Sequence, residues 1–235
     1  MTVLTILFFL VSASVFSQTL PSWFIPLRDA IYEQQLTADQ IVPIYRQAAE
    51  SARTSLTGAE QAVMLSRCEY MMGRAYQYED RKNEAIRHYD EGIKYAERAL
   101  EIRESDAAWV MYAENISQSC VVRPASYAVA NGLRVERYAK SAIALNRRNG
   151  AAHFLVAARW VYAPTPFHNY NRGIEMLNVI INESHLEKDD LFNVYSALGY
   201  AYMQRRNKEQ ARTWLQESLK IYPTNKYVRS LLDTL

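Results

Sequence analysis

Four histidines and two cysteines are the side chains of this 235-residue chain most suited to acid–base or metal chemistry. They are spread along the chain rather than grouped, at His88, His153, His168, His185, Cys68 and Cys120. A metal site needs several such ligands at short spacing, and a nucleophilic site needs a serine or cysteine with a histidine base. The sequence has neither arrangement, and it lacks a Gly-rich phosphate loop, GxSxG and HExxH. We therefore expect no enzymatic activity, no metal and no cofactor.

The segment Pro164–Tyr170 (PTPFHNY) is the most unusual loop of the sequence. Two prolines stiffen it, and aromatic side chains on a rigid loop are suited to binding. The alternative is a spacer between two helices. The candidate ligand or loop contacts are Trp160, Tyr162, Phe167, His168 and Tyr170.

Two features would matter if the chain enters a secretory pathway. Cys68 and Cys120 could then form one disulfide, although burial as free thiols is the more common state of such cysteines. Asn115 and Asn182 each begin an Asn-x-Ser triplet, the acceptor pattern for glycosylation in eukaryotes.

The elements that position these residues follow from an internal repeat. Gly73, Ala113, Ala157 and Gly199 lie 40, 44 and 42 residues apart. Aromatic and small residues recur 3 and 12 positions after the first and the last of them, as Tyr76, Ala85, Tyr202 and Ala211. A small residue on one helix lets the next helix approach closely, so the pattern predicts a pair of antiparallel helices in each repeat.

The C-terminal copy resembles the tetratricopeptide repeat (TPR) family. The matching positions are Tyr195, Leu198, Gly199, Tyr202, Ala211, Leu215, Ser218 and Pro223. The copy around Gly73 departs at Glu97, where the family has a proline, and the two middle copies are degenerate. The resemblance implies an all-α, right-handed α-solenoid of about four helix pairs, with capping helices at both ends.

The chain divides into four predicted regions. Residues 1–17 read as a signal peptide with an apolar core at Val3–Val11, and the alternative is an uncleaved membrane anchor. Residues 18–56 form an N-terminal segment and capping helix, 57–223 the repeat array, and 224–235 a C-terminal capping helix. Thr37 and Thr57, each followed three residues later by Gln or Glu, predict capped helix starts.

The charge balance limits the kinds of partner. The net charge is +2, from 27 basic and 25 acidic residues. This balance gives no sign of nucleic-acid binding. With the signal peptide removed, we expect no membrane span in the mature chain.

Stacked helix pairs form a concave face that is lined by the first helix of each pair. The leading hypothesis is an exported adaptor or scaffold, periplasmic or secreted, that binds another protein there. Residues chosen by helical position as contacts are Arg67, Arg74, Glu114, Arg159 and Gln204; the alternative is that they are solvated surface. Reversing the charges of Arg67 and Arg74 is expected to weaken association without unfolding the chain.

A second hypothesis comes from a looser resemblance. An exported array with a proline-containing insertion is similar to the bacterial periplasmic TPR subunits that partner solute-binding proteins of TRAP-type transporters. That resemblance implies a pore for a small apolar ligand, or a solute-binding protein as partner. Its lining would be Trp160, Tyr162, Phe167 and Tyr170.

Overall fold

The computed structural model describes residues 20–235, which fold into helices without a β-strand. The predicted signal peptide lies outside the described residues. The helices are α1 (Ile25–Glu33), α2 (Ala38–Ser55), α3 (Gly58–Tyr78), α4 (Lys82–Ile102), α5 (Asp106–Val122), α6 (Ala125–Leu145), α7 (Gly150–Tyr162), α8 (Tyr170–Glu183), α9 (Lys188–Gln204), α10 (Lys208–Ile221) and α11 (Lys226–Asp233).

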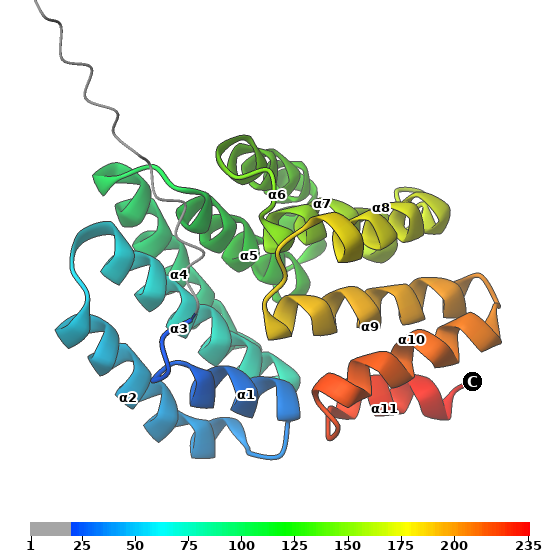
Figure 1. Ribbon diagram of the computed structural model, residues 1–235. Coiled ribbons are helices and arrows are strands. Elements are labelled where there is room, and N and C mark those ends of the chain that lie inside the picture. Colours follow the sequence, from blue (N-terminus) through cyan, green and yellow to red (C-terminus); the bar gives the residue numbers. More distant parts are fainter. Residues whose placement is uncertain (1–19) are drawn as a thin grey trace, which may run out of the picture.

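Four antiparallel helix pairs stack side by side: α3 with α4, α5 with α6, α7 with α8, and α9 with α10 (Figure 1). Successive pairs join where α4 packs on α5, α6 on α7, and α8 on α9. Helices α1 and α2 precede the pairs, and α11 follows them. The predicted all-α solenoid of four pairs with terminal helices is confirmed.

The small residues of the repeat are required by close helix packing. A Cβ atom on Gly73 would lie 2.4 Å from the ring of Tyr89, and one on Gly199 would lie 2.6 Å from Leu215. The remaining small positions of the pattern are fully buried: Ala85, Ala113, Ala157 and Ala211. In the α3–α4 and α9–α10 pairs, a large side chain of the second helix therefore fills the space that a glycine of the first helix leaves open.

The helix starts agree with the sequence in part. Thr37 and Gln40 form the predicted reciprocal capping box at the start of α2. Thr57 makes no side-chain bond at the start of α3, so that prediction was wrong. Gln61 is used differently: its side-chain amide donates to the backbone oxygens of Arg53 and Leu56, at 2.9 and 2.6 Å. It thereby satisfies carbonyls at the end of α2.

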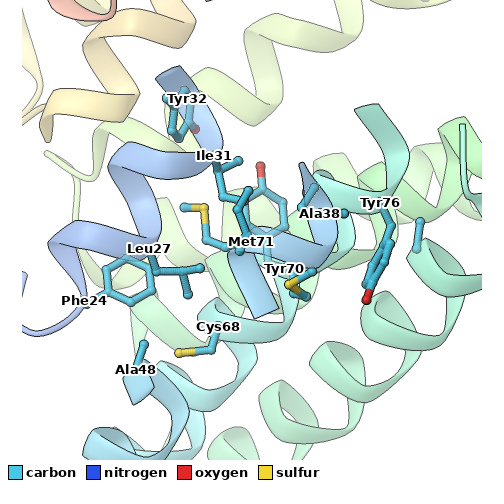
Figure 2. Close-up of a cluster of buried hydrophobic side chains, with 14 of the residues drawn as sticks. Phe24, Leu27, Ile31, Tyr32, Ala38, Ala48, Cys68, Tyr70, Met71 and Tyr76 are labelled. Atoms are coloured by element: carbon cyan, nitrogen blue, oxygen red, sulfur yellow. The ribbon is translucent and has the colours of Figure 1, made fainter. Parts of the chain in front are cut away.

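The largest apolar core joins the two ends of the described part of the chain, residues 20–235. Figure 2 shows Phe24, which directly precedes α1, and Leu27, Ile31 and Tyr32 of α1 gathered with Met71 of α3. The same cluster includes side chains from the last repeat and α11, namely Phe192, Leu215, Tyr222 and Val228. A linear array buries only contacts between neighbouring repeats, so this shared core makes the fold a closed one.

None of the helices in residues 20–235 combines the length and apolarity that a membrane span requires.

Candidate protein-interaction face

The first helices of the pairs line the inside of the curve. Helices α3, α5, α7 and α9 pack against one another in turn, in addition to their own partners. They are thus the inner helices of the curve, and α4, α6, α8 and α10 each pack on one or two of them (Figure 1). The concave face has a charged part, which α1 covers, and an aromatic part.

Arg67 of α3, Glu114 of α5 and Asp189 of α9 form the charged part. The Nη2 atom of Arg67 lies 3.6 Å from Oδ2 of Asp189, and Asp189 is only 3% exposed. The pKa of Glu114 is raised to about 7, mainly by burial; the charge of Arg67 opposes this rise, the charge of Asp189 adds to it, and Arg74 opposes it. Glu114 therefore lies among both acidic and basic side chains.

Arg74 lies within a group of tyrosines. Its guanidinium carbon is 4.6 Å from the ring centre of Tyr32, 5.7 Å from that of Tyr70 and 5.3 Å from that of Tyr78. One Nη atom donates to the Tyr32 hydroxyl at 2.7 Å, and the other donates to the Tyr78 hydroxyl. Stacking of a guanidinium on partly desolvated rings is a stabilising arrangement. Arg74 is therefore a structural anchor between α1 and α3.

Helix α1 lies across the charged part. The guanidinium of Arg67 stands 5.6 Å from the ring centre of Phe24, and Nη1 of Arg28 is 4.0 Å from Oδ1 of Asp189. The Tyr32 hydroxyl also accepts from the side-chain amide of Asn193 at 3.0 Å. Helix α1 therefore contacts both α3 and α9.

The same helix is bonded to the C-terminal end of the array. The side-chain amide of Asn225 donates to the backbone oxygen of Tyr32 at 2.7 Å, and the Tyr222 hydroxyl donates to Asp29 Oδ1 at 3.0 Å. The rings of Tyr32 and Tyr222 are stacked with centres 5.0 Å apart. Gln34 accepts from the backbone N–H of Lys226 at 2.8 Å. These bonds link α1, which precedes the repeats, to the end of the last repeat.

The aromatic part, which we call the tyrosine face, consists of Tyr78, Tyr162, Tyr200 and Tyr227. Tyr78, Tyr162 and Tyr227 are 41%, 46% and 42% exposed, and the rings of Tyr162 and Tyr200 are 5.3 Å apart. Burial nevertheless raises the pKa of Tyr162 well above its usual range, and Tyr227 and Tyr200 add to the rise. The pKa of Tyr227 rises to about 12 through burial, with contributions from Tyr200 and Tyr78. The four tyrosines therefore lie near one another, with protein around rings that are still partly exposed.

Three of the five predicted partner contacts come together. Arg67, Arg74 and Glu114 share the charged part of the concave face, where internal contacts engage them. Arg159 does not join them, because it pairs with Glu136 of α6. Gln204 lies exposed at the end of α9.

The predicted loop contacts do not form a common lining. His168 and Tyr170 stack on each other with centres 4.5 Å apart, whereas Phe167 is 62% exposed. The Trp160 ring packs against the guanidinium of Arg172 at 4.1 Å. The loop is tied back where the Asn169 N–H donates to the Trp160 carbonyl at 2.8 Å. Among the predicted contacts, Tyr162 belongs to the tyrosine face. Tyr170 lies close enough to Tyr200 to raise the pKa of Tyr200.

The structure describes both features that would matter in a secretory pathway, the two cysteines and the two Asn-x-Ser triplets. Cys68 and Cys120 are free thiols, so the disulfide that the sequence allowed is not formed. Burial raises the pKa of Cys68 to about 12, which makes this thiol unreactive. Asn115 is fully buried, which makes it unavailable to a glycan, whereas Asn182 is exposed.

One histidine pairs with a buried acid. His88 Nδ1 lies 2.6 Å from Glu69 Oε2, and the Tyr45 hydroxyl donates to Glu69 Oε1 at 2.5 Å. These groups line a cavity of about 620 Å³; a second cavity, of about 430 Å³, lies beside His153. Within residues 20–235, no group of three or more acidic, histidine or cysteine side chains is arranged to hold a metal ion.

Sequence reasoning missed Tyr78, Tyr200 and Tyr227 as members of a face. It also missed the role of α1, whose buried residues Phe24, Leu27, Ile31 and Tyr32 have helical spacing. That spacing is the signal that could have found the helix. Its position across the concave face depends on contacts with distant residues.

Glu114→Gln is expected to stabilise the chain by about 2 kcal/mol at pH 8. The pKa of this carboxyl is raised from 4.5 to about 7 by folding. The folded chain therefore binds the proton more tightly, and stability is lost as the pH rises through 7. Because glutamine does not ionise, the variant lacks this loss. Its greater free energy of unfolding should therefore disappear as the pH falls toward 4.5.

Urea unfolding followed by circular dichroism across this pH range checks the prediction. Glu183→Gln, at an exposed position on α8, controls for the loss of a carboxylate. The prediction would be contradicted if the free energies of unfolding of Glu114→Gln and the unmodified chain differed by the same amount at every pH.

Comparisons with known proteins agree with this architecture. A family model for regulator of microtubule dynamics protein 1-3 matches residues 27–183, and a tetratricopeptide repeat model matches residues 192–225. The latter match confirms the predicted TPR family at the C-terminal copy. Neither model is of a transporter-associated subunit, so that resemblance stays a prediction.

A solved structure of YrrB, described as a TPR protein with an unusual peptide-binding site, aligns with a TM-score of 0.38 at 13% identity, over 91% of each chain. No curated protein sequence matches significantly. The first family model spans more than half of the chain, including α1 and the pairs up to α8. The chain therefore belongs to the regulator of microtubule dynamics protein 1-3 family.

Proposed function

We propose that this protein is an adaptor that binds a segment of another protein on the tyrosine face. The observation that carries this proposal is the grouping of Tyr78, Tyr162, Tyr200 and Tyr227, which come from four helices and of which all but the half-buried Tyr200 are exposed. A TPR array ordinarily serves interaction rather than catalysis, which agrees with the lack of a catalytic motif. The family name suggests partners connected with microtubules.

The chemistry of the tyrosine face suits a polypeptide partner. Each ring offers a broad apolar surface, and its hydroxyl bonds with backbone groups of a ligand. Tyrosine loses little conformational entropy on binding, which is why it is enriched among the residues that dominate interface energies. Arg74 holds Tyr78 in place through its hydrogen bond, so one wall of the face is preorganised.

Replacing Tyr162 and Tyr200 by alanine is expected to weaken partner binding at least about 30-fold, the size of an interface hot spot of about 2 kcal/mol. The first probe is polymerised tubulin in a co-sedimentation assay. If tubulin does not bind, the assay moves to a partner identified by cross-linking from the native cell. Phe167→Ala is the matched control, because Phe167 is a 62% exposed aromatic outside the tyrosine face.

Binding that is unaffected by the double variant, with the chain still folded, would contradict the proposal. Equal losses in the double variant and in Phe167→Ala would also contradict it, since they would point to the loop instead.

As the alternative to a partner connected with microtubules, which an exported chain would not meet, we propose that the chain is exported through residues 1–17. The support is the apolar stretch Val3–Val11 followed by small residues. Intact mass of the protein from its native cell tests the proposal: cleavage after Ser17 leaves a chain that begins at Gln18. A chain that retains these residues in the membrane fraction would instead support the uncleaved anchor.

A further inference from the structure

Positive charge is concentrated in the middle of the chain. Residues 115–174 contain eight of the 27 basic side chains but only one of the 25 acidic ones, Glu136. The side chain of Glu136 is only 15% exposed, and both Lys140 and Arg159 pair with it. The near-neutral total charge therefore conceals a strongly basic region, which runs from within α5 to the start of α8.

The outer side of α6 displays much of this charge. The buried residues of α6 are Val135, Ala139 and Ala142, which lie on one side of the helix. Helix α6 is the outer helix of its pair (Figure 1), so its opposite side is exposed to solvent. We call this exposed side, together with the turn that follows it, the α6 face; it consists of Val129, Leu133, Arg137, Lys140, Arg147 and Arg148.

The other outer helices differ from α6 in their charge. Each of them carries exposed side chains of both signs, namely Arg98 and Glu101 on α4, Arg172 and Glu175 on α8, and Glu209 and Arg212 on α10. Interspersed charges of both signs are enough for solubility, so solvation alone does not require a face with cations only. The three arginines of the α6 face form no ion pair with another residue of 20–235, which leaves their charges available to a partner.

The α6 face begins with two exposed apolar side chains. Val129 is 84% exposed and Leu133 is 66% exposed, and Val129 is the most exposed of the large apolar side chains in residues 20–235. No residue of α6 before Val135 is buried. The α6 face therefore offers an aliphatic contact at its start and cations along the rest of its length.

The far end of the α6 face borders a cavity. Arg147 and Arg148 line the cavity of about 430 Å³ together with Glu175 and Glu183 of α8. An anionic ligand that crossed this cavity would meet the two carboxylates, so it is confined to α6. From Val129 to the end of α6 the helix rises by about 24 Å, which is the length of about seven residues of extended polypeptide.

We propose that the α6 face binds an acidic segment of another protein, with apolar side chains at the end that meets Val129 and Leu133. Its carboxylates pair with the cations that follow, and a guanidinium matches a carboxylate with two parallel hydrogen bonds. An anionic bilayer fits less well, because a flat surface would also meet the carboxylates exposed on α4 and α8. A nucleic acid has no aliphatic side chain for Val129 and Leu133. The α6 face is separate from the tyrosine face, and the proposal does not depend on the function proposed there.

The probe is a fluorescent peptide of two leucines followed by five glutamates, whose binding to the full chain is measured by fluorescence anisotropy. Arg137→Glu combined with Arg148→Glu should weaken binding at least about tenfold, because each reversal replaces an attraction by a repulsion. Arg98→Glu combined with Arg212→Glu is the matched control, since it reverses the same number of exposed charges on α4 and α10. The control should change the affinity less than about twofold.

A second pair of variants tests the apolar end. Val129→Ser combined with Leu133→Ser should weaken binding of the leucine peptide about threefold, through the loss of apolar contact. The same variant should bind a peptide with serines in place of the leucines as the unmodified chain does. Because all the substituted residues are exposed, the variants should keep the circular dichroism spectrum of the unmodified chain.

Four outcomes would overturn the proposal. Failure of the unmodified chain to bind the peptide at low salt would exclude an acidic partner. Equal losses in the two pairs of charge reversals would show that net charge alone attracts the peptide. Serine variants that bind both peptides as the unmodified chain does would exclude the apolar contact. Tighter binding to phosphatidylcholine vesicles with 30% phosphatidylserine, or to single-stranded DNA, that is lost with the α6 reversals would assign the face to a membrane or to a nucleic acid instead.

Discussion

Arg74→Glu is expected to lower the free energy of unfolding by about 4 kcal/mol, the scale for removing one partner of a buried charged contact. The native side chain donates to the hydroxyls of Tyr32 and Tyr78 and stacks among three rings. A glutamate loses both bonds and turns the attraction between cation and rings into repulsion. It also adds a negative charge near Glu114, whose pKa already responds to Arg74.

This result would correct the expectation that reversing Arg67 and Arg74 leaves the fold intact. Both arginines were chosen as free contacts of a concave face, yet α1 covers them. Urea unfolding by circular dichroism at pH 7 measures the loss. Arg134→Glu, a reversal at an exposed position of α6, is the control and should change stability by less than about 0.5 kcal/mol. An Arg74→Glu chain as stable as this control would show that the contacts of Arg74 contribute nothing.

The repeat architecture could be predicted because its signals are local. The ring of Tyr89 packs where Gly73 lacks a side chain, and Leu215 does the same at Gly199. Both contacts join the two helices of one pair, so their spacing in the sequence is short and recurs. Helix starts were harder to predict. The sequence after Thr57 fits a capping box, yet Thr57 forms no capping bond, and Gln61 bonds to the end of α2.

The closure of the array could not be predicted from spacing. It depends on Asp29 meeting Lys188 and Tyr222, and on Asn225 meeting Tyr32, across sequence separations of 159 to 193 residues. No periodic pattern encodes such contacts, and a single sequence gives no signal for them. For the same reason the tyrosine face was missed, since α11 must fold back before Tyr227 can approach Tyr78.

The charged residues that were predicted as partner contacts show that the position of a side chain on a helix does not determine what it binds. Arg67, Arg74 and Glu114, which were chosen by helical position, lie near one another on α3 and α5. Helical position could not tell that a helix outside the repeats would cover them, because the sequence assigned α1 to a segment before the array. The exposed part of the same face carries uncharged tyrosines, which no charge-based choice would select.

The second large effect is expected from Gly73→Ala, which should destabilise the chain by about 3 kcal/mol, at the upper end for an overpacked core. The new Cβ would lie 2.4, 2.7 and 2.9 Å from three atoms of the Tyr89 ring. Tyr89 cannot easily retreat, because it is fully buried and its hydroxyl donates to Gln77 at 2.7 Å. Opening the α3–α4 pair to relieve the clash would disturb the contacts of both helices.

Gly132→Ala is the matched control, since the same substitution there meets no atom within 4 Å. Gly132 lies inside α6, where alanine favours the helix over glycine by up to about 1 kcal/mol. The two variants should therefore shift the urea midpoint in opposite directions, which separates the steric effect of Gly73 from the general effect of removing a helical glycine. If Gly73→Ala also stabilised the chain, Tyr89 would have to pack elsewhere, and the small-residue repeat would lose its physical basis.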